Sequence, residues 1–123
     1  MTEIKVKSSI DGSEEVSLLY KADGSSPRPL IVGLHTWSMD RFNQVDNLLP
    51  IAKELNWHLL LPEFRGPNLI TNLRGKEACG STLAKQDIID AVDYAIQNYP
   101  VDSDKAYLMV AMASSPFVMG LSA

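Results

Sequence analysis

The chain contains one cysteine, Cys79, and a serine pair, Ser114 and Ser115, that follows an apolar run. A thiol or hydroxyl attacks a carbonyl carbon when a general base, most often histidine, takes its proton. Cys79 lies beside Gly80 with no histidine near it in the sequence, so we interpret it as a small loop residue. Ser114 and Ser115 precede Pro116, which favours a turn or a helix cap there; a displaced nucleophile is the alternative.

Metal-binding and acid–base side chains are few. Only two histidines, His35 and His58, are present, which argues against a multi-histidine metal centre. Asp87, Asp90 and Asp93 recur every three residues in a segment with helical periodicity, and we expect them on its solvated face rather than around a metal. The sequence has no phosphate-binding G-x-x-x-x-G-K loop, no G-x-G-x-x-G fingerprint and no H-E-x-x-H helix. We therefore expect no cofactor and no metal.

The composition is close to the globular average. The chain has 123 residues, of which 46% are hydrophobic and 21% charged, so we expect one domain with its own core. The net charge is −4 and no basic run is present, which argues against nucleic-acid binding. A single cysteine excludes an internal disulfide.

Both ends of the chain bear on its location. The opening residues, MTEIKVKSS, lack the apolar stretch of a secretory signal, so we expect a cytoplasmic protein. Residues 106–123 are uncharged and long enough for a short membrane span. Ser114, Ser115 and Pro116 interrupt this stretch and no basic residue follows it. We interpret it as a buried strand that runs into a turn.

The strand patterns predict an α/β fold with a mixed sheet. Residues 3–8 and 14–22 alternate polar and apolar side chains around an Asp11-Gly12 turn, which predicts an antiparallel hairpin at a sheet edge. Three unbroken apolar runs are typical of strands covered on both faces. They lie at residues 30–34, 58–62 and 107–110. Their alternation with helices predicts parallel neighbours joined by right-handed crossovers.

Two helices separate these strands. Asp40 is the expected N-cap of the first, with Pro50 kinking or restarting it. The second is predicted from residue 83 to residue 99, where Pro100 ends it. Its expected apolar side consists of Ile88, Ile89, Val92, Ile96 and Tyr99.

Three segments together carry a resemblance to a known family. They are PLIVGLHTWSMDRF at 29–42, NWHLLLPEFRGPN at 56–68 and ACGSTLAKQDIIDAVDYAIQNYPVDSDKAYLM at 78–109. This ordered set resembles the α/β-hydrolase fold, and more narrowly the catalytic domain of the prolyl oligopeptidase group and its esterase relatives. The resemblance implies a partial α/β-hydrolase sheet that lacks the C-terminal strands. Its parts are an edge hairpin at 1–22, a family-like core at 29–109 and a divergent tail at 110–123.

The resemblance also implies an oxyanion loop after the first buried strand. In the family, a backbone N–H of this loop stabilises the charge that develops on the carbonyl oxygen in the transition state. The matching residues here are His35, Thr36 and Trp37, with the amide of Thr36 or Trp37 as the donor. The alternative is that His35 only ends a strand and Trp37 only packs.

The nucleophile, acid and base of the family are not intact. The family's fifth strand runs into G-x-S-x-G, and the corresponding serine position falls near Met112. Ala111 and Ala113 replace the flanking glycines, which the strained elbow requires. The family order is serine, acid, histidine, yet no Asp, Glu or His follows Met112. His58 is predicted to begin a strand rather than to act as the base.

Two functional hypotheses follow. The first is a truncated or degenerate serine hydrolase, inactive as this chain, with ester or peptide hydrolysis as its ancestral reaction. The second is a non-catalytic protein that binds a partner or self-associates. Its physical basis is the last buried strand, which the resemblance places beside an absent sixth strand and leaves unpaired, open to a second copy or a complementing fragment. The residues of this strand are Tyr107, Leu108, Met109 and Val110.

Overall fold

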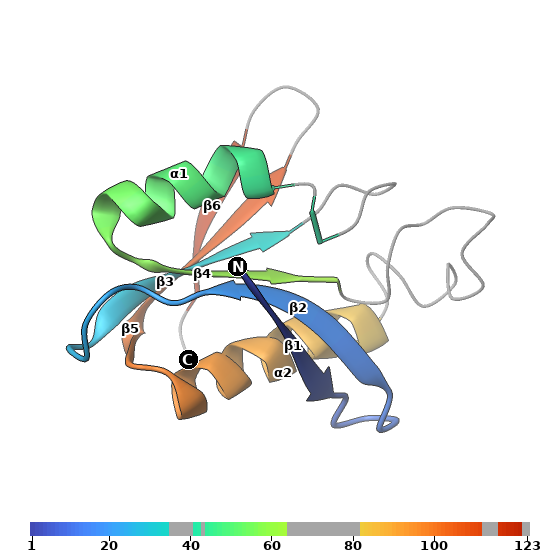
Figure 1. Cartoon of the computed structure of the whole chain (residues 1–123). Coiled ribbons are helices and arrows are strands. Elements are labelled where there is room, and N and C mark those ends of the chain that lie inside the picture. Colours follow the sequence, from blue (N-terminus) through green and yellow to red (C-terminus); the bar gives the residue numbers. More distant parts are fainter. Residues whose placement is uncertain (35–40, 43, 64–81, 112–115, 122–123) are drawn as a thin grey trace.

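A twisted sheet with one helix on each face forms the part of the chain that the structure describes (Figure 1). The computed structural model describes residues 1–34, 41–42, 44–63, 82–111 and 116–121. The order of the strands in the sheet is β1-β2-β4-β3-β5-β6. The strands are β1 Thr2–Lys7, β2 Glu14–Tyr20, β3 Arg28–Leu34, β4 His58–Pro62, β5 Val101–Ala111 and β6 Pro116–Leu121, and the helices are α1 Val45–Leu55 and α2 Thr82–Asn98.

The first two strands form the predicted edge hairpin. β1 pairs antiparallel with β2, and Lys7 lies opposite Glu14. Ile4 and Val6 are buried while their neighbours in β1 are exposed, as the two-residue period of a half-buried strand requires. Gly12 in the turn has φ of 72°, a left-handed conformation that glycine adopts without steric cost.

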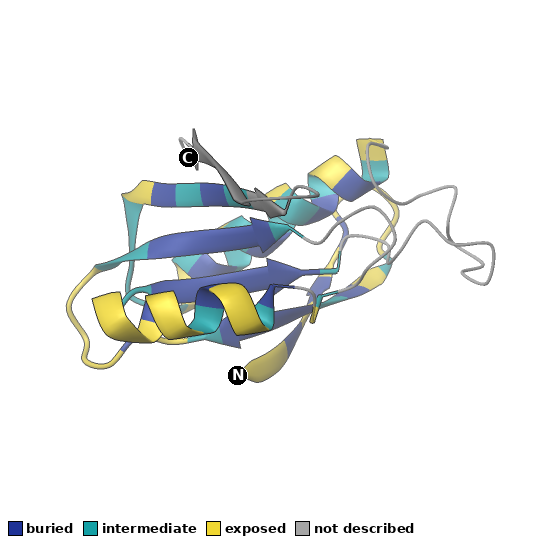
Figure 2. Cartoon of the chain, turned by 90° about the horizontal axis from the view of Figure 1, so that it is seen from above, coloured by how far each residue is buried: buried dark blue, intermediate teal, exposed yellow. Residues whose placement is uncertain are grey.

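The three apolar runs lie side by side at the centre, as predicted. β3 pairs in parallel with β4 on one side and with β5 on the other. Leu30, Leu59 and Leu60 are fully buried because both faces of these strands are covered. Figure 2 shows the same burial along β3 and β4. β5 begins at Val101, earlier than the expected start at Tyr107.

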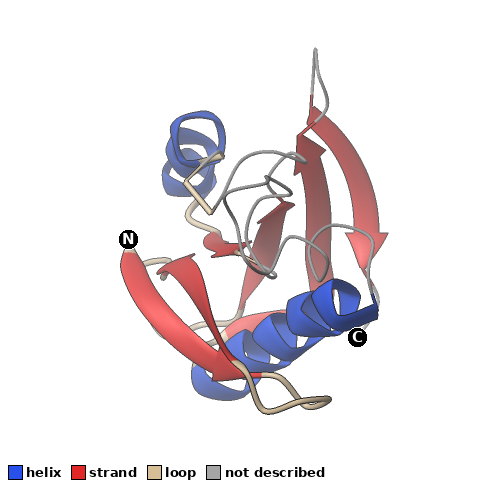
Figure 3. Ribbon diagram, turned by 90° about the vertical axis from the view of Figure 1, so that its right-hand side faces the viewer, coloured by secondary structure: helices blue, strands red, loops and turns tan. Residues whose placement is uncertain are grey.

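The two helices cover opposite faces of the sheet and create two separate core clusters (Figure 3). Successive residues of β4 point to opposite faces, so each cluster receives side chains from the same strands. The cluster on the α1 side contains Leu18, Ile31, Leu48, Ala52, Leu59 and Leu61. The cluster on the α2 side contains Ile4, Val6, Leu19, Leu30, Val32, Leu60, Ala91, Ala95, Ala106 and Leu108.

Helix α2 lies within one residue of its predicted bounds, but part of its predicted orientation is wrong. Asp87, expected on the solvated face, is only 4% exposed, and Ile89, expected on the apolar side, is 52% exposed. The buried stripe instead follows Ala84, Ala91 and Ala95, whose small side chains let the helix approach the sheet closely. Asp87 lies on the same stripe, one turn from two of these alanines.

Helix α1 begins later than predicted. The expected N-cap, Asp40, lies outside the described residues, and the helix runs over Val45–Leu55 with Gln44 at the N-cap position. The Gln44 carbonyl accepts the first hydrogen bond of the helix at 2.9 Å. The helix continues through Pro50 and ends at Asn56, which adopts the left-handed conformation with φ of 55°.

The prediction of an unpaired strand at 107–110 is wrong, because β6 pairs antiparallel with β5. The pairing extends from Ala111 opposite Pro116 to the other end of β6. Residues 112–115 connect the two strands, which suits a hairpin and is far shorter than the crossover of about a dozen residues that a parallel strand requires. Association with a second copy or a complementing fragment stays a prediction.

The uncharged stretch at 106–123 contributes to two strands rather than a membrane helix. Residues 106–111 belong to β5 and residues 116–121 to β6. Of the helices in the described part of the chain, neither is long and apolar enough to cross a membrane.

Candidate active site at the carboxyl edge of the sheet

The carboxyl ends of β3, β4 and β5 lie at one edge of the sheet, because the three strands are parallel. We call this the carboxyl edge; open α/β sheets bind their ligands there. β3 ends at Leu34, β4 at Pro62 and β5 at Ala111. Leu34 is the register partner of Val110. The segments that follow β3 and β5 therefore start from neighbouring positions.

The sequence-predicted site residues follow these two strand ends directly but lie outside the described residues. They are His35, Thr36 and Trp37 after β3, and Met112, Ser114 and Ser115 after β5. Their proposed chemical roles stay predictions. The described residues around them show how the edge is built.

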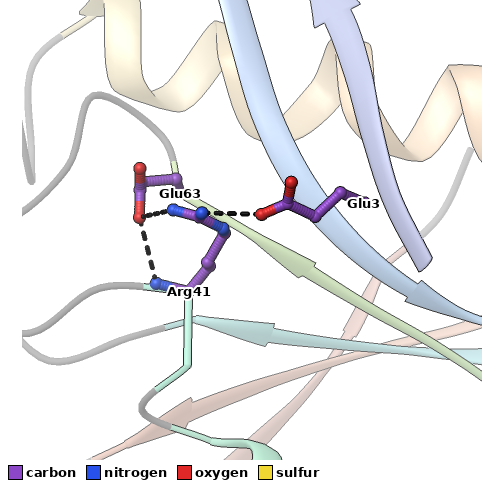
Figure 4. Close-up of polar contacts among 3 residues, drawn as sticks. All are labelled: Glu3, Arg41 and Glu63. Atoms are coloured by element: carbon purple, nitrogen blue, oxygen red, sulfur yellow. Dashed lines mark hydrogen bonds and ion pairs between the residues drawn. The ribbon is translucent and has the colours of Figure 1, made fainter. Parts of the chain in front are cut away.

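Arg41 joins three parts of the chain at this edge (Figure 4). Its Nη1 donates to Glu63 Oε1 and its Nη2 donates to Glu3 Oε1, each at 2.7 Å. Its backbone N–H also donates to Glu63 Oε1, at 3.4 Å. The guanidinium carbon lies 4.6 Å from the centre of the Phe42 ring, within the range of a cation–π contact.

The electrostatic balance keeps Arg41 charged. Burial lowers the pKa of its guanidinium, but the hydrogen bonds and charges of Glu3 and Glu63 outweigh burial and raise the pKa above its ordinary value. Glu63 is the first residue after β4, and Glu3 belongs to β1. One side chain thus connects the segment that precedes α1, the carboxyl end of β4 and the edge strand β1.

Gln44 and Gly33 bring α1 close to the end of β3. The Gln44 side chain is fully buried, and its Nε2 donates to the Leu34 carbonyl at 3.2 Å. A Cβ added at Gly33 would lie 2.6 Å from Leu48 Cδ1 and 2.6 Å from Leu61 Cδ2. The absent side chain therefore permits the close packing of α1 on the strand that carries the predicted oxyanion loop.

His58 lies at the amino-terminal end of β4, away from the carboxyl edge, and its contacts serve the structure of the sheet. It begins β4, as predicted, and is fully buried. Its Nδ1 accepts from the Ala22 N–H at 3.0 Å, so Nε2 carries the proton and donates to the Pro100 carbonyl at 2.8 Å. Burial lowers the pKa of His58; the charges of Lys21 and Arg28 lower it further, against the hydrogen bond to Pro100.

Sequence reasoning missed the polar residues that organise the carboxyl edge. Arg41, Gln44 and Glu63 belong to no short motif, and their partners are distant in the sequence. Gly33 had a usable signal, because a glycine inside an apolar strand often marks a close approach. Within the described ranges, no cluster of three His, Cys, Asp or Glu side chains could hold a metal ion.

Comparison with known proteins supports the fold. No protein-family model matches the chain, and no curated protein matches it. Solved structures do match: a bacterial heroin esterase has a TM-score of 0.65 and 16% identity, over 87% of this chain and 33% of that one. S-Formylglutathione hydrolase FrmB from Staphylococcus aureus has a TM-score of 0.65 and 14% identity, over 89% and 46%. An esterase from Pyrobaculum calidifontis has a TM-score of 0.63 and 16% identity, over 89% and 34%.

The chain therefore has a partial α/β-hydrolase fold. It spans between a third and a half of the length of these proteins.

Proposed function

We propose that this chain is the amino-terminal part of a serine-hydrolase core, from the prolyl oligopeptidase-like group and its esterase relatives. The observation that carries the proposal is the register of Leu34 with Val110. In an α/β-hydrolase fold, this pairing starts the oxyanion segment and the nucleophile segment from adjacent positions. Ester hydrolysis is the preferred ancestral reaction, because the compared structures include a heroin esterase and an archaeal esterase.

The proposed chemistry assigns one part of the reaction to this chain. The amide of Thr36 or Trp37 donates to the oxygen of a tetrahedral intermediate, where negative charge develops. Attack on the carbonyl needs a serine, a histidine that takes its proton and an acid that orients the histidine. No Asp, Glu or His follows the nucleophile position near Met112. We therefore propose that this chain does not hydrolyse an ester or a peptide bond by itself.

The test measures turnover and covalent labelling. The purified chain and the variants Ser114→Ala and Ser115→Ala are incubated with p-nitrophenyl acetate and with a fluorophosphonate probe. Ser26 lies in the exposed loop between β2 and β3, so Ser26→Ala is the matched control. We expect turnover at the buffer rate and no labelling in all four proteins. Turnover that Ser114→Ala or Ser115→Ala abolishes, and that Ser26→Ala preserves, would show an active displaced nucleophile.

The alternative of a non-catalytic binding protein has lost its original physical basis. It depended on an unpaired strand at 107–110, and β6 occupies that position. The hydrolase-derived proposal is therefore the one that the described residues favour.

A further inference from the structure

The outer edge of β1 has no strand partner in the part of the chain that the structure describes (Figure 1). Alternate residues of an antiparallel strand direct their backbone groups to opposite sides. The Val16 carbonyl accepts from the Glu63 N–H at 3.1 Å, so the backbone groups of Val16 point away from β1. Lys5, the register partner of Val16, therefore directs its own N–H and C=O to the open edge. Glu3 and Lys7 share this orientation, which gives an added strand a ladder of donors and acceptors.

A groove of about 310 Å³ lies between this edge and helix α2. Its volume is at the lower end of the range for ligand sites, and it can hold one long side chain. The residues that line it come from β1 and α2; they are Lys5, Val6, Lys7, Asp90, Asp93, Tyr94 and Gln97. An open strand edge and a groove therefore lie side by side, which is the arrangement that binds an extended peptide by strand addition.

The groove offers charges of both signs to a ligand. Asp90 is already occupied, because its carboxylate accepts from the Ser9 N–H at 2.8 Å and from the Ser9 hydroxyl at 3.0 Å. The side chains of Asp93 and Lys7 form no hydrogen bond or ion pair with any described residue. A complementary ligand therefore supplies a cation to Asp93 and an anion to Lys7.

The two-residue period of β1 places these charges on different faces of the sheet. Val6 packs in the core cluster on the α2 side. Glu3 lies opposite Leu18, which packs in the core cluster on the α1 side. Residues directly opposite each other share a face, so Lys5 and Lys7 belong with Glu3 to the α1 side. An added strand meets lysine side chains on one face and the side chains of α2 on the other.

We infer that this edge binds an extended peptide with alternating acidic and basic residues, in which one arginine lies between two glutamates. The glutamates lie opposite Lys5 and Lys7, and the arginine lies opposite Val6 and reaches Asp93 in the groove. Opposite charges on facing residues stabilise a pair of strands. The arginine stem covers the apolar part of Tyr94 while its planar head binds the carboxylate. The inference uses no residue of the proposed hydrolase chemistry.

A second copy of β1 matches this edge less well. Residues whose backbone groups point outward pair with each other, so the residues of the second β1 that face α2 are Thr2, Ile4 and Val6. None of these carries a cation for Asp93. Lysine on an edge strand also opposes association of identical edges. The charges of the groove therefore favour the peptide.

The experiment measures the fluorescence anisotropy of a labelled peptide, Thr-Val-Glu-Arg-Glu-Val-Thr, mixed with the full chain. The control peptide is its isomer Thr-Glu-Val-Arg-Val-Glu-Thr, in which the three charges share one face. Both peptides are acidic and the chain has a net charge of −4, so long-range attraction favours neither of them. We expect saturable binding of the first peptide, at least about fivefold tighter than that of the isomer.

The variants separate the groove from the strand edge. Asp93→Asn removes the carboxylate of the groove, and Asp46→Asn, at an exposed position of α1, is its matched control. Lys5→Pro removes a backbone N–H that points to the open edge, and Lys5→Gln removes only the charge. We expect Asp93→Asn to bind about threefold to fivefold more weakly than the wild type, and Asp46→Asn to bind equally. Lys5→Pro should bind at least about threefold more weakly than Lys5→Gln.

Several outcomes would overturn the inference. They are no saturable binding to the wild type up to about 1 mM peptide, equal binding of the isomer, and equal binding by Asp93→Asn and the wild type. Circular dichroism checks the fold of each variant, and if Lys5→Pro does not fold, the isomer and Asp93→Asn decide. Sedimentation equilibrium tests the second copy. A wild-type dimer that Lys5→Pro dissociates would assign the edge to self-association and refute peptide binding as its role; monomers throughout would support it.

Discussion

His58 forms hydrogen bonds with two other segments, so substitutions of His58 test how the amino-terminal ends of the central strands are held together. Its imidazole accepts from the Ala22 N–H and donates to the Pro100 carbonyl, so it connects the loop after β2, the start of β4 and the turn before β5. The Pro100 carbonyl has a second donor in the Arg28 N–H at 3.0 Å. Ala22 is buried, and its N–H has His58 as its acceptor. Substitution of His58 therefore leaves the Pro100 carbonyl with the Arg28 N–H as donor, but removes the acceptor of the Ala22 N–H.

The perturbation is His58→Leu, which fills similar space and has no acceptor. It leaves a buried N–H at Ala22 unsatisfied, which costs about 1–3 kcal/mol, and it removes the bond to Pro100, worth about 1 kcal/mol. We expect the free energy of unfolding to fall by about 2–4 kcal/mol, a large share of the roughly 5–15 kcal/mol typical of a domain. His58→Gln keeps a donor and an acceptor and should lose less.

The pH dependence provides an independent measure. The pKa of His58 is lowered in the folded state by burial, so the unfolded state, with a pKa of about 6.5, binds more protons as the pH falls. The stabilising contribution is therefore present above pH of about 6.5 and is lost below it, with a slope of at most about 1.4 kcal/mol per pH unit. Neither variant can titrate at position 58, so both should lack this slope.

The assay is urea unfolding at pH 7.5, 6.5 and 5.5, followed by circular dichroism and by tryptophan fluorescence. The chain has two tryptophans, Trp37 and Trp57, and Trp57 precedes His58 and stacks on Tyr107 with ring centres 5.7 Å apart, so part of the emission reports on the surroundings of His58. The reasoning is refuted if His58→Leu unfolds at the wild-type urea concentration at pH 7.5. It is also refuted if wild type and His58→Leu lose the same free energy between pH 6.5 and 5.5.

Two further predictions concern packing and the hairpin. Gly33→Ala should lower the free energy of unfolding by about 1–3 kcal/mol, because Leu48 and Leu61 must move to admit a Cβ; an unchanged urea midpoint would contradict this. Asp90→Ala should lower the free energy of unfolding by about 1 kcal/mol more than Asp93→Ala in the same urea assay, because Asp90 accepts a hydrogen bond from the Ser9 N–H at 2.8 Å. Asp93→Ala is the control, since both substitutions raise helix propensity equally. Equal losses would show that the contact between Ser9 and Asp90 contributes nothing to stability.

The centre of the fold was predictable because burial on both faces leaves a direct trace in the sequence. The runs at 30–34 and 58–62 contain no charged residue, and the structure places both inside the sheet. The hairpin was predictable because only one face of β1 is covered, and a half-buried strand has alternating apolar and polar residues. Asp87 was not predictable in this way. Its burial depends on the close approach that three alanines allow, and residue type alone assigns an aspartate to solvent.

The carboxyl edge was predictable only in outline. The resemblance placed the candidate site after the strands that are β3 and β5, and because these strands are parallel, both following segments start at the same edge of the sheet. The contacts of Arg41 did not follow, because Glu3 and Glu63 approach it through the topology of β1 and β4 rather than through local spacing. Gln44 was missed for a similar reason, since its partner is a backbone carbonyl that any residue could supply.

The contacts that hold the described part of the sheet together are distinct from the residues of the proposed chemistry. Both core clusters are formed by described residues, with α1 supplying one face and α2 the other. β6 pairs with residues 106–111 of β5, so the hydrogen-bonding groups on that side of this part of β5 have partners within the chain. The contacts of His58 and Arg41 hold opposite edges of the same sheet. These contacts lie among the described residues and involve neither the proposed oxyanion loop nor the nucleophile position near Met112, so we expect substitutions at Ser114 and Ser115 to leave the free energy of unfolding nearly unchanged.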